Sequence, residues 1–167
     1  GLTINLANLA LNTGDAKGDT YANIQLIEGT TFADTLVGDN SGNKFRGDQG
    51  NDTIKGGAGA DLLFGAEGND QLFGEADDDD ILGQQGSDKL YGGGGKDTIQ
   101  GAESNDLIEG GDGDDWLEGG VGNDNIYTAL AAEPIFTGIA PTLNSNGRFL
   151  PNGAPAWQTD AFLVPAE

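Results

Sequence analysis

The chain has 167 residues, enough for one ordinary domain, and contains no Cys, His or Met. Disulfides, thiolate metal sites and imidazole catalysis are therefore excluded. The 28 acidic residues outnumber the 7 basic ones and give a formal charge of −21. A chain with this charge should repel nucleic acid and anionic membranes and attract cations. No apolar run approaches the ~18 residues of a membrane span.

Residues 1–28 contain two strand-like runs, LTINLANL (2–9) and ANIQLIE (22–28), around NTGDAKGDT (12–20). We expect this segment to cap the repeats that follow, because a repeat array needs its end covered. Asp15 and Asp19 could bind a cation, although a solvated loop is the more ordinary interpretation. The chain begins at Gly1 without Met or a signal peptide, and we expect it to be part of a longer protein.

From residue 29 to residue 127 the sequence repeats every nine residues, eleven times without an insertion. The first position of every repeat is Gly. The sixth position is Asp in ten repeats and Asn43 in the other: Asp34, Asp52, Asp61, Asp70, Asp79, Asp88, Asp97, Asp106, Asp115 and Asp124. The eighth position is always apolar: Leu36, Phe45, Ile54, Leu63, Leu72, Ile81, Leu90, Ile99, Ile108, Leu117 and Ile126. The fourth position is Gly except at Phe32, Ser41, Asp77 and Ser104.

Thirty glycines with a high charge are typical of a disordered linker. Low-complexity sequence does not keep the Gly, Asp and apolar positions in register over eleven repeats. The alternative that stays open is an array that is disordered until a ligand binds. Nine residues suit a turn of about six followed by a strand of three. Side chains alternate along a strand, so the eighth position points inward and the seventh and ninth point outward. Glycines in the turn permit positive φ and close backbone approach.

Four repeats, GGAGADLLF (56–64), GGGGKDTIQ (92–100), GGDGDDWLE (110–118) and GGVGNDNIY (119–127), match G-G-x-G-x-D-x-U-x at every fixed position. The array over residues 29–127 resembles the RTX (repeats-in-toxin, haemolysin-type) calcium-binding nonapeptides. The resemblance implies an all-β, right-handed parallel β-roll with two nonapeptides per coil and calcium ions between the turns. Residue i then stacks on residue i+18, about 4.8 Å away.

This stacking places the sixth-position carboxylates side by side, which is unfavourable unless they are protonated or bridged by a cation. Calcium takes six to eight oxygen ligands from carboxylates and carbonyls, and glycine turns offer carbonyls without obstruction. Nine pairs are separated by 18 residues, and eight of them are Asp–Asp. We expect the ninth pair, Asn43 with Asp61, to be weak or empty, and Phe32 puts the site of Asp34 in doubt.

By resemblance, each ion takes carbonyls from the second and fourth positions of one turn and from the first and third positions of the turn 18 residues on, with both aspartates. One site is Gly57, Gly59 and Asp61 with Gly74, Ala76 and Asp79, and another is Gly93, Gly95 and Asp97 with Gly110, Asp112 and Asp115. The remaining predicted backbone ligands are Gly47, Asp48, Gly50, Gly65, Ala66, Glu67, Gly68, Gly83, Gln85, Gly92 and Gly94.

One inward aliphatic residue per nonapeptide makes a thin core, so metal binding must supply much of the folding free energy. We predict an array that is largely disordered without calcium and folds cooperatively with it. By resemblance the chain is a calcium-binding module of a larger secreted bacterial protein, exported unfolded by type I secretion and folded outside the cell. Its further partners would be other domains of that protein.

Residues 128–167 depart from the repeat pattern and are expected to form a C-terminal cap or a linker, with a secretion signal as a third option. The outer positions place Leu62, Phe64 and Leu82 on one sheet face. They place Phe73, Tyr91 and Leu107 on the other face, and such clusters can mark a partner surface. Surface scatter or packing of the C-terminal tail explains them equally well.

An adhesive solenoid and an enzyme are the two alternative classes of function. An adhesive or surface-attachment solenoid would use its outer faces, but the seventh positions do not form the regular Thr row expected of an ice-binding face. Paired carboxylates can also catalyse glycoside hydrolysis. Here the pairs recur at every coil, which suits metal sites better than a single active site, and we expect no enzyme activity.

Overall fold

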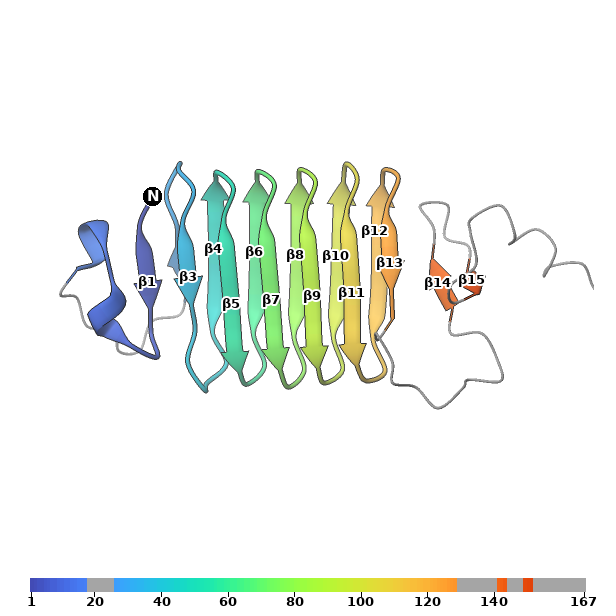
Figure 1. Ribbon diagram of the computed structural model, residues 1–167, viewed down its shortest axis with the longest axis horizontal. Helices are drawn as coiled ribbons and strands as arrows, with labels where there is room; N and C mark the ends of the chain where they lie inside the picture. The colour runs from blue at the N-terminus through green and yellow to red at the C-terminus, as the bar shows by residue number, and fades with distance from the viewer. Residues whose placement is uncertain (18–25, 129–140, 144–148, 152–167) are drawn as a thin grey trace, which may run out of the picture.

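The computed structural model describes residues 1–17, 26–128, 141–143 and 149–151. The chain winds as a solenoid whose successive strands alternate between two parallel sheets (Figure 1). The seven-stranded sheet contains β1 (Thr3–Asn5), β3 (Thr35–Val37), β5 (Thr53–Ala58), β7 (Gln71–Ala76), β9 (Lys89–Gly94), β11 (Leu107–Asp112) and β13 (Asn125–Tyr127). The six-stranded sheet contains β2 (Ile27–Glu28), β4 (Lys44–Gln49), β6 (Leu62–Glu67), β8 (Asp80–Gln85), β10 (Thr98–Glu103) and β12 (Trp116–Val121). The predicted all-β parallel β-roll is confirmed.

Neighbouring strands within each sheet pair in the predicted register of 18 residues, except β1 and β3, where Thr3 lies opposite Thr35. In the seven-stranded sheet Ile54 lies opposite Leu72, and in the six-stranded sheet Ile81 lies opposite Ile99. Two nonapeptides therefore make one coil, and each repeat contacts its equivalent in the next coil.

The inner faces of the two sheets form one narrow core. The eighth-position side chains are fully buried from Leu36 to Ile108, and Leu117 and Ile126 are nearly so. Burying such a side chain contributes about 1.5–3 kcal/mol. From Gly38 onward the first-position glycines, two residues after an aliphatic residue, are also buried, so the core gains only one large side chain per repeat.

The strands are longer than the sequence predicted. From β4 to β12 each strand has six residues and runs through positions seven, eight and nine into the first three positions of the next repeat. The ladder between β4 and β6 pairs Lys44–Arg46 and Asp48–Gln49 with their equivalents but leaves out Gly47. The predicted three-residue strand was too short, because stacked turns continue the backbone hydrogen bonding at their second and third positions. Each six-residue turn thus shares its first three positions with a strand.

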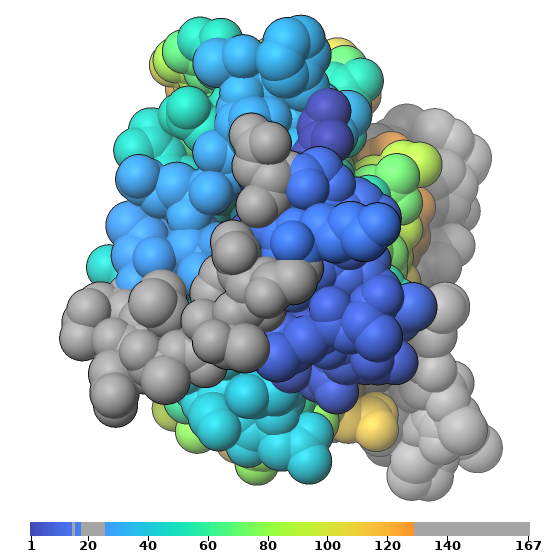
Figure 2. Space-filling view, turned by 90° about the vertical axis from the view of Figure 1, so that its left-hand side faces the viewer, coloured from blue at the N-terminus to red at the C-terminus, as the bar shows by residue number. Residues whose placement is uncertain are grey.

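The N-terminal segment packs against the first coil, and Figure 2 looks onto this end of the molecule. β1 pairs with β3, and Ile4, Ala16 and Ile27 join the core. The first predicted run gives only the three-residue strand β1, followed by two short 3-10 helices, η1 (Leu9–Leu11) and η2 (Gly14–Ala16). Residues 18–25, which include Asp19, lie outside the described residues, as does the side chain of Asp15.

At the other end, β14 (Pro141–Leu143) and β15 (Phe149–Pro151) form an antiparallel pair, and β14 contacts β12 and β13. This contact is what a C-terminal cap requires. The cap nevertheless stays a prediction, because most of residues 128–167 lie outside the described part. Within the described residues, no helix is long and apolar enough to cross a membrane.

Candidate metal sites

The turns form two rows along the roll. We call the row that follows the strands of the six-stranded sheet the first edge; its turns begin at Gly29, Gly47, Gly65, Gly83, Gly101 and Gly119. The row that follows the strands of the seven-stranded sheet is the second edge; its turns begin at Gly38, Gly56, Gly74, Gly92 and Gly110. Each turn ends at the sixth position of its repeat.

The sixth-position aspartates lie inside these rows, in contact from coil to coil. Nine of the ten are buried, and Asp115 in the last coils is half-buried. Oδ1 of each aspartate from Asp52 onward accepts the backbone N–H of the sixth residue 18 positions earlier, at 2.6–3.0 Å. All nine pairs predicted from the spacing are therefore brought together.

The second carboxylate oxygen has no such partner. Oδ2 is buried and accepts no hydrogen bond in eight residues: Asp52, Asp61, Asp70, Asp79, Asp88, Asp97, Asp106 and Asp124. A buried anionic oxygen without a partner is costly, and its natural complement is a cation or a proton.

Glycine at the first position creates the space into which this oxygen points. A Cβ atom on Gly56 would overlap Oδ2 of Asp61 and lie 2.9 Å from the carbonyl oxygen of Gly74, in the next coil. The same arrangement holds at Gly47, where the carbonyl oxygen of Gly65 would lie 2.8 Å from the added Cβ. A carboxylate oxygen and a carbonyl oxygen therefore approach the same small volume with no donor between them.

The other predicted carbonyls face the same gaps. Carbonyl oxygens at second and fourth positions point toward the next coil, since a Cβ on Gly93 would overlap the carbonyl of Glu75, and one on Gly68 that of Gly50. Carbonyls at third positions point back, as Glu67 does when it accepts the Gly50 N–H at 2.9 Å. On each edge, the backbone ligands expected from the sequence thus border one gap between successive turns, although ion binding by each residue stays a prediction.

Burial changes the acidity of these carboxyls in the polypeptide. Loss of solvation raises the pKa of Asp79 and Asp88 from 3.8 to about 7, with the neighbouring carboxylates of the row adding to the rise and a backbone hydrogen bond opposing it. Burial likewise raises the pKa to about 6 in Asp52, Asp61, Asp70 and Asp106, and raises that of Asp97. A bound cation would favour the ionised form instead.

The donor set fits a hard cation that accepts many carbonyl oxygens. Among the described residues no group of three or more Asp, Glu, His or Cys side chains could hold a metal. Each gap instead offers two carboxylates and several carbonyls, which suits calcium, with its six to eight oxygens and flexible geometry.

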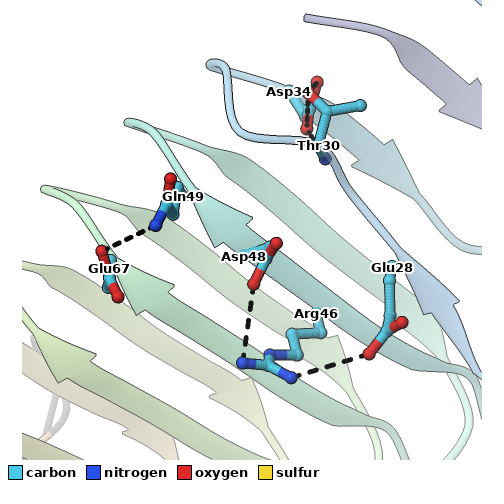
Figure 3. Close-up of polar contacts among 7 residues, drawn as sticks. All are labelled: Glu28, Thr30, Asp34, Arg46, Asp48, Gln49 and Glu67. Carbon is cyan, nitrogen blue, oxygen red and sulfur yellow. Dashed lines mark hydrogen bonds and ion pairs between the residues drawn. The ribbon is translucent and has the colours of Figure 1, made fainter.

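The two sites doubted from the sequence do differ from the others. Asn43 is half-buried and its Oδ1 accepts the Asp39 N–H at 3.0 Å, so this pair lacks one charge. Asp34, unlike the aspartates above, has hydrogen-bond partners for both carboxylate oxygens. Both of its oxygens accept the Thr30 hydroxyl (Figure 3), and Oδ1 also accepts the Leu2 N–H at 2.6 Å.

Sequence reasoning missed Leu2 and Thr30 as partners of Asp34. Leu2 lies outside the repeats, so no spacing connects it with the first turn. Thr30 occupies the second position of its repeat, where several other repeats have Gly, and the pattern therefore does not mark it as a partner. Every second and fourth position from Asp48 to Gly122 has positive φ. Glycines in the turn allowed for this conformation, but the sequence did not indicate that non-glycine residues at second positions share it: Asp48, Ala66, Glu75, Gln84 and Ala102.

The outer faces carry the predicted apolar residues on the predicted sheets, all half-buried. The rings of Phe73 and Tyr91 stack with centroids 4.9 Å apart, and Lys55 lies over Phe73. On the six-stranded sheet, Arg46 bridges Glu28 and Asp48 (Figure 3). Beside Arg46 is a shallow hollow of about 350 Å³ that is lined mainly by polar side chains.

The fold and the buried carboxylate rows place the chain among repeat proteins built as parallel β-rolls. The model of one family, described as RTX calcium-binding nonapeptide repeat, matches in four copies, over residues 28–63, 37–72, 55–90 and 91–126. These matches span more than half of the chain, and the chain belongs to this family of calcium-binding repeats. A comparison with curated proteins finds no match.

Proposed function

We propose that the chain is a calcium-dependent folding module of a larger secreted bacterial protein. The observation that carries the proposal is the set of eight buried Oδ2 atoms, along the two edges, that have no hydrogen-bond partner. An apolar core of one residue per repeat cannot offset eight unpaired buried carboxylates. Calcium in the gaps would remove this cost, so its binding free energy becomes folding free energy.

The charge of the array supports the same conclusion. Residues 29–127 contain 22 acids and 5 bases, a net charge of −17. Eight or nine calcium ions would add +16 to +18 and nearly cancel this charge. Without the ions, self-repulsion favours the expanded chain.

Calcium is favoured over magnesium because the gaps are lined by backbone carbonyls held in fixed turns. Magnesium requires near-ideal octahedral geometry and keeps several waters, whereas calcium accepts irregular oxygen sets. Sites of extracellular modules typically bind in the ~10⁻⁴–10⁻³ M range, which suits a chain unfolded in the cytosol and folded outside. The family is typical of secreted proteins, and type I export of an unfolded chain is consistent with this switch.

The test of binding is calorimetric titration of the calcium-stripped chain with calcium and, separately, with magnesium. The proposal predicts uptake of several calcium ions and little response to magnesium. Equal binding of both ions, or uptake of fewer than two calcium ions, would overturn it.

An adhesive role for the outer faces is the second candidate, favoured by the stacked Phe73–Tyr91 pair beside Lys55. Aromatic side chains contribute strongly to the energetics of protein interfaces. Adsorption of the calcium-loaded chain to cell surfaces tests it, with Phe73→Ala as the variant. Adsorption that depends on Phe73 while calcium uptake is unchanged supports this role, and the absence of adsorption removes it.

No carboxylate pair is distinguished as catalytic, because equivalent pairs recur along the roll.

A further inference from the structure

One gap on the second edge differs from the rest, the gap between turns 56–61 and 74–79. Its second turn has Asp77 at the fourth position, where seven of the eleven repeats have Gly. Asp77 adopts a φ of 75°, in the left-handed region, and among the described fourth positions only Ser104 (φ 79°) shares this with a side chain. Such a conformation is strained for a residue other than Gly.

The Asp77 carboxylate replaces a backbone acceptor. In three other turns the fourth-position N–H donates to the third-position carbonyl of the next coil, at 2.9 Å: Gly50 to Glu67, Gly68 to Gln85 and Gly95 to Asp112. Gly59 instead donates to Oδ2 of Asp77 at 3.0 Å. The third-position carbonyl in this gap, Ala76, is thereby relieved of that N–H, and it is one of the predicted calcium ligands.

The same gap carries extra negative charge around a buried carboxylate. Asp61 is 3% exposed, and its unpartnered Oδ2 lies beside the carbonyl of Gly74. The neighbouring carboxylates that repel Asp61 are Asp39, Glu75 and Asp77. Glu75 is paired with Lys55 at 3.9 Å, whereas no ion pair engages Asp77 among the described residues. On the first edge Asp48 is paired with Arg46, and Glu67 accepts a hydrogen bond from Gln49.

We propose that the gap between Asp61 and Asp79 binds calcium more tightly than the other gaps and fills first, with Asp77 as a positioning residue. Asp77 acts through its charge and by holding the Gly59 N–H, and the ion itself is held by Asp61, Asp79 and the carbonyls. This inference rests on the proposed function, since it concerns the order in which calcium sites fill.

If this gap fills first, folding begins at an interior coil of the array and not at one of its ends. Repeats contact only their neighbours, so an ordered coil at residues 56–79 can propagate in both directions. Folding that began at an end would order the terminal coils before these residues.

The experiment is calcium titration of the full chain by calorimetry, for the native sequence, Asp77→Gly, Asp77→Asn and Ser104→Gly. Both glycine variants relieve positive φ, but only Asp77→Gly removes a carboxylate. We expect the first calcium ion to bind about tenfold more weakly in both Asp77 variants, because one nearby charge is lost, and to bind unchanged in Ser104→Gly. Hydrogen exchange at sub-stoichiometric calcium should protect residues 56–79 first in the native chain.

Uniform binding of all ions in the native chain, or an unchanged first ion in Asp77→Asn, would overturn this inference and leave the calcium module intact. An equal loss in Ser104→Gly would also overturn it, because backbone conformation and not charge would then set the affinity. A native chain that takes up no calcium would overturn the proposed function as well.

Discussion

The backbone N–H of Asp52 donates to Oδ1 of Asp70, 18 residues further along the chain, at 2.8 Å. The other oxygen of Asp70 is buried without a partner. One carboxylate thus ties two coils together through Oδ1 and leaves Oδ2 for a cation. Because the row is continuous, each interior aspartate borders two gaps, one with the preceding coil and one with the following coil.

Replacing Asp70 by Asn should weaken two calcium sites at once. The amide oxygen can still accept the Asp52 N–H, but Nδ2 places a donor where a cation ligand is needed. We expect the calcium midpoint of folding to rise several-fold and the stoichiometry to fall by about one to two ions, because ligand charge sets calcium affinity. Calorimetry and circular dichroism measure the two effects.

The reciprocal change, Asn43→Asp, is the matched control, since it supplies the missing carboxylate of the ninth pair. It should add about one ion or lower the calcium midpoint. If Asp70→Asn leaves both stoichiometry and midpoint unchanged, the shared-carboxylate account is wrong.

Adding a methyl group at Gly93 should destabilise the folded roll. Gly93 has a φ of 117°, and a Cβ there would overlap the carbonyl oxygen of Glu75. We expect Gly93→Ala to cost about 1–3 kcal/mol and Ala102→Gly, at an equivalent position, to be neutral or stabilising. Thermal melts of the calcium-loaded variants compare the two changes, and equal melting temperatures for Gly93→Ala and the native chain would contradict this explanation of the turn.

The thin core should still be sensitive to truncation. Ile81 is fully buried between the sheets, whereas Leu82, one residue on, is half-buried on the outer face. Ile81→Ala should destabilise the calcium-loaded roll by about 2–5 kcal/mol, and Leu82→Ala by clearly less. Denaturant unfolding at saturating calcium gives both values, and a larger effect at Leu82 would reverse the assignment of inside and outside.

Acid should stabilise the roll in the absence of calcium. Burial raises the pKa of Asp79 and Asp88 from 3.8 to about 7, so folding favours their neutral form. The resulting stabilisation is complete below about pH 4 and is lost as the pH rises through about 7. We therefore expect more strand signal at pH 5 than at pH 8 in calcium-free buffer.

With calcium present the direction should reverse, because protons compete with the ion for the same carboxylates. The calcium midpoint should thus be higher at pH 5 than at pH 8. A calcium-free chain whose circular dichroism is the same at both pH values would show that the buried carboxyls do not control folding.

The nonapeptide period predicted the core row, and the resemblance to RTX repeats, which implies two nonapeptides per coil, supplied the register of 18 and with it the two outer faces. Once Ile81 is placed inside, the period of 18 puts Ile99 opposite it and sends Leu82 outward. The pairing of Asp52 with Asp70 followed from the same arithmetic. These predictions succeeded because every repeat occupies an equivalent environment.

Features that break the period could not be predicted in this way. The link from Leu2 to Asp34 joins a segment outside the repeat to its first turn. Ala66 and Gln84 adopt positive φ although neither favours it, since stacking on the neighbouring turns imposes this conformation. The role of Asp77 depends on which N–H its carboxylate reaches, and only the folded arrangement shows that partner to be Gly59.

The most direct test of the account is far-UV circular dichroism of the full chain at pH 8, titrated with calcium from excess chelator, with magnesium as the control. The account predicts a coil-like spectrum at the start, a cooperative change to strand with calcium, and no such change with magnesium. A spectrum already rich in strand in chelator, and unaltered by calcium, would contradict it and mean that packing alone holds the roll.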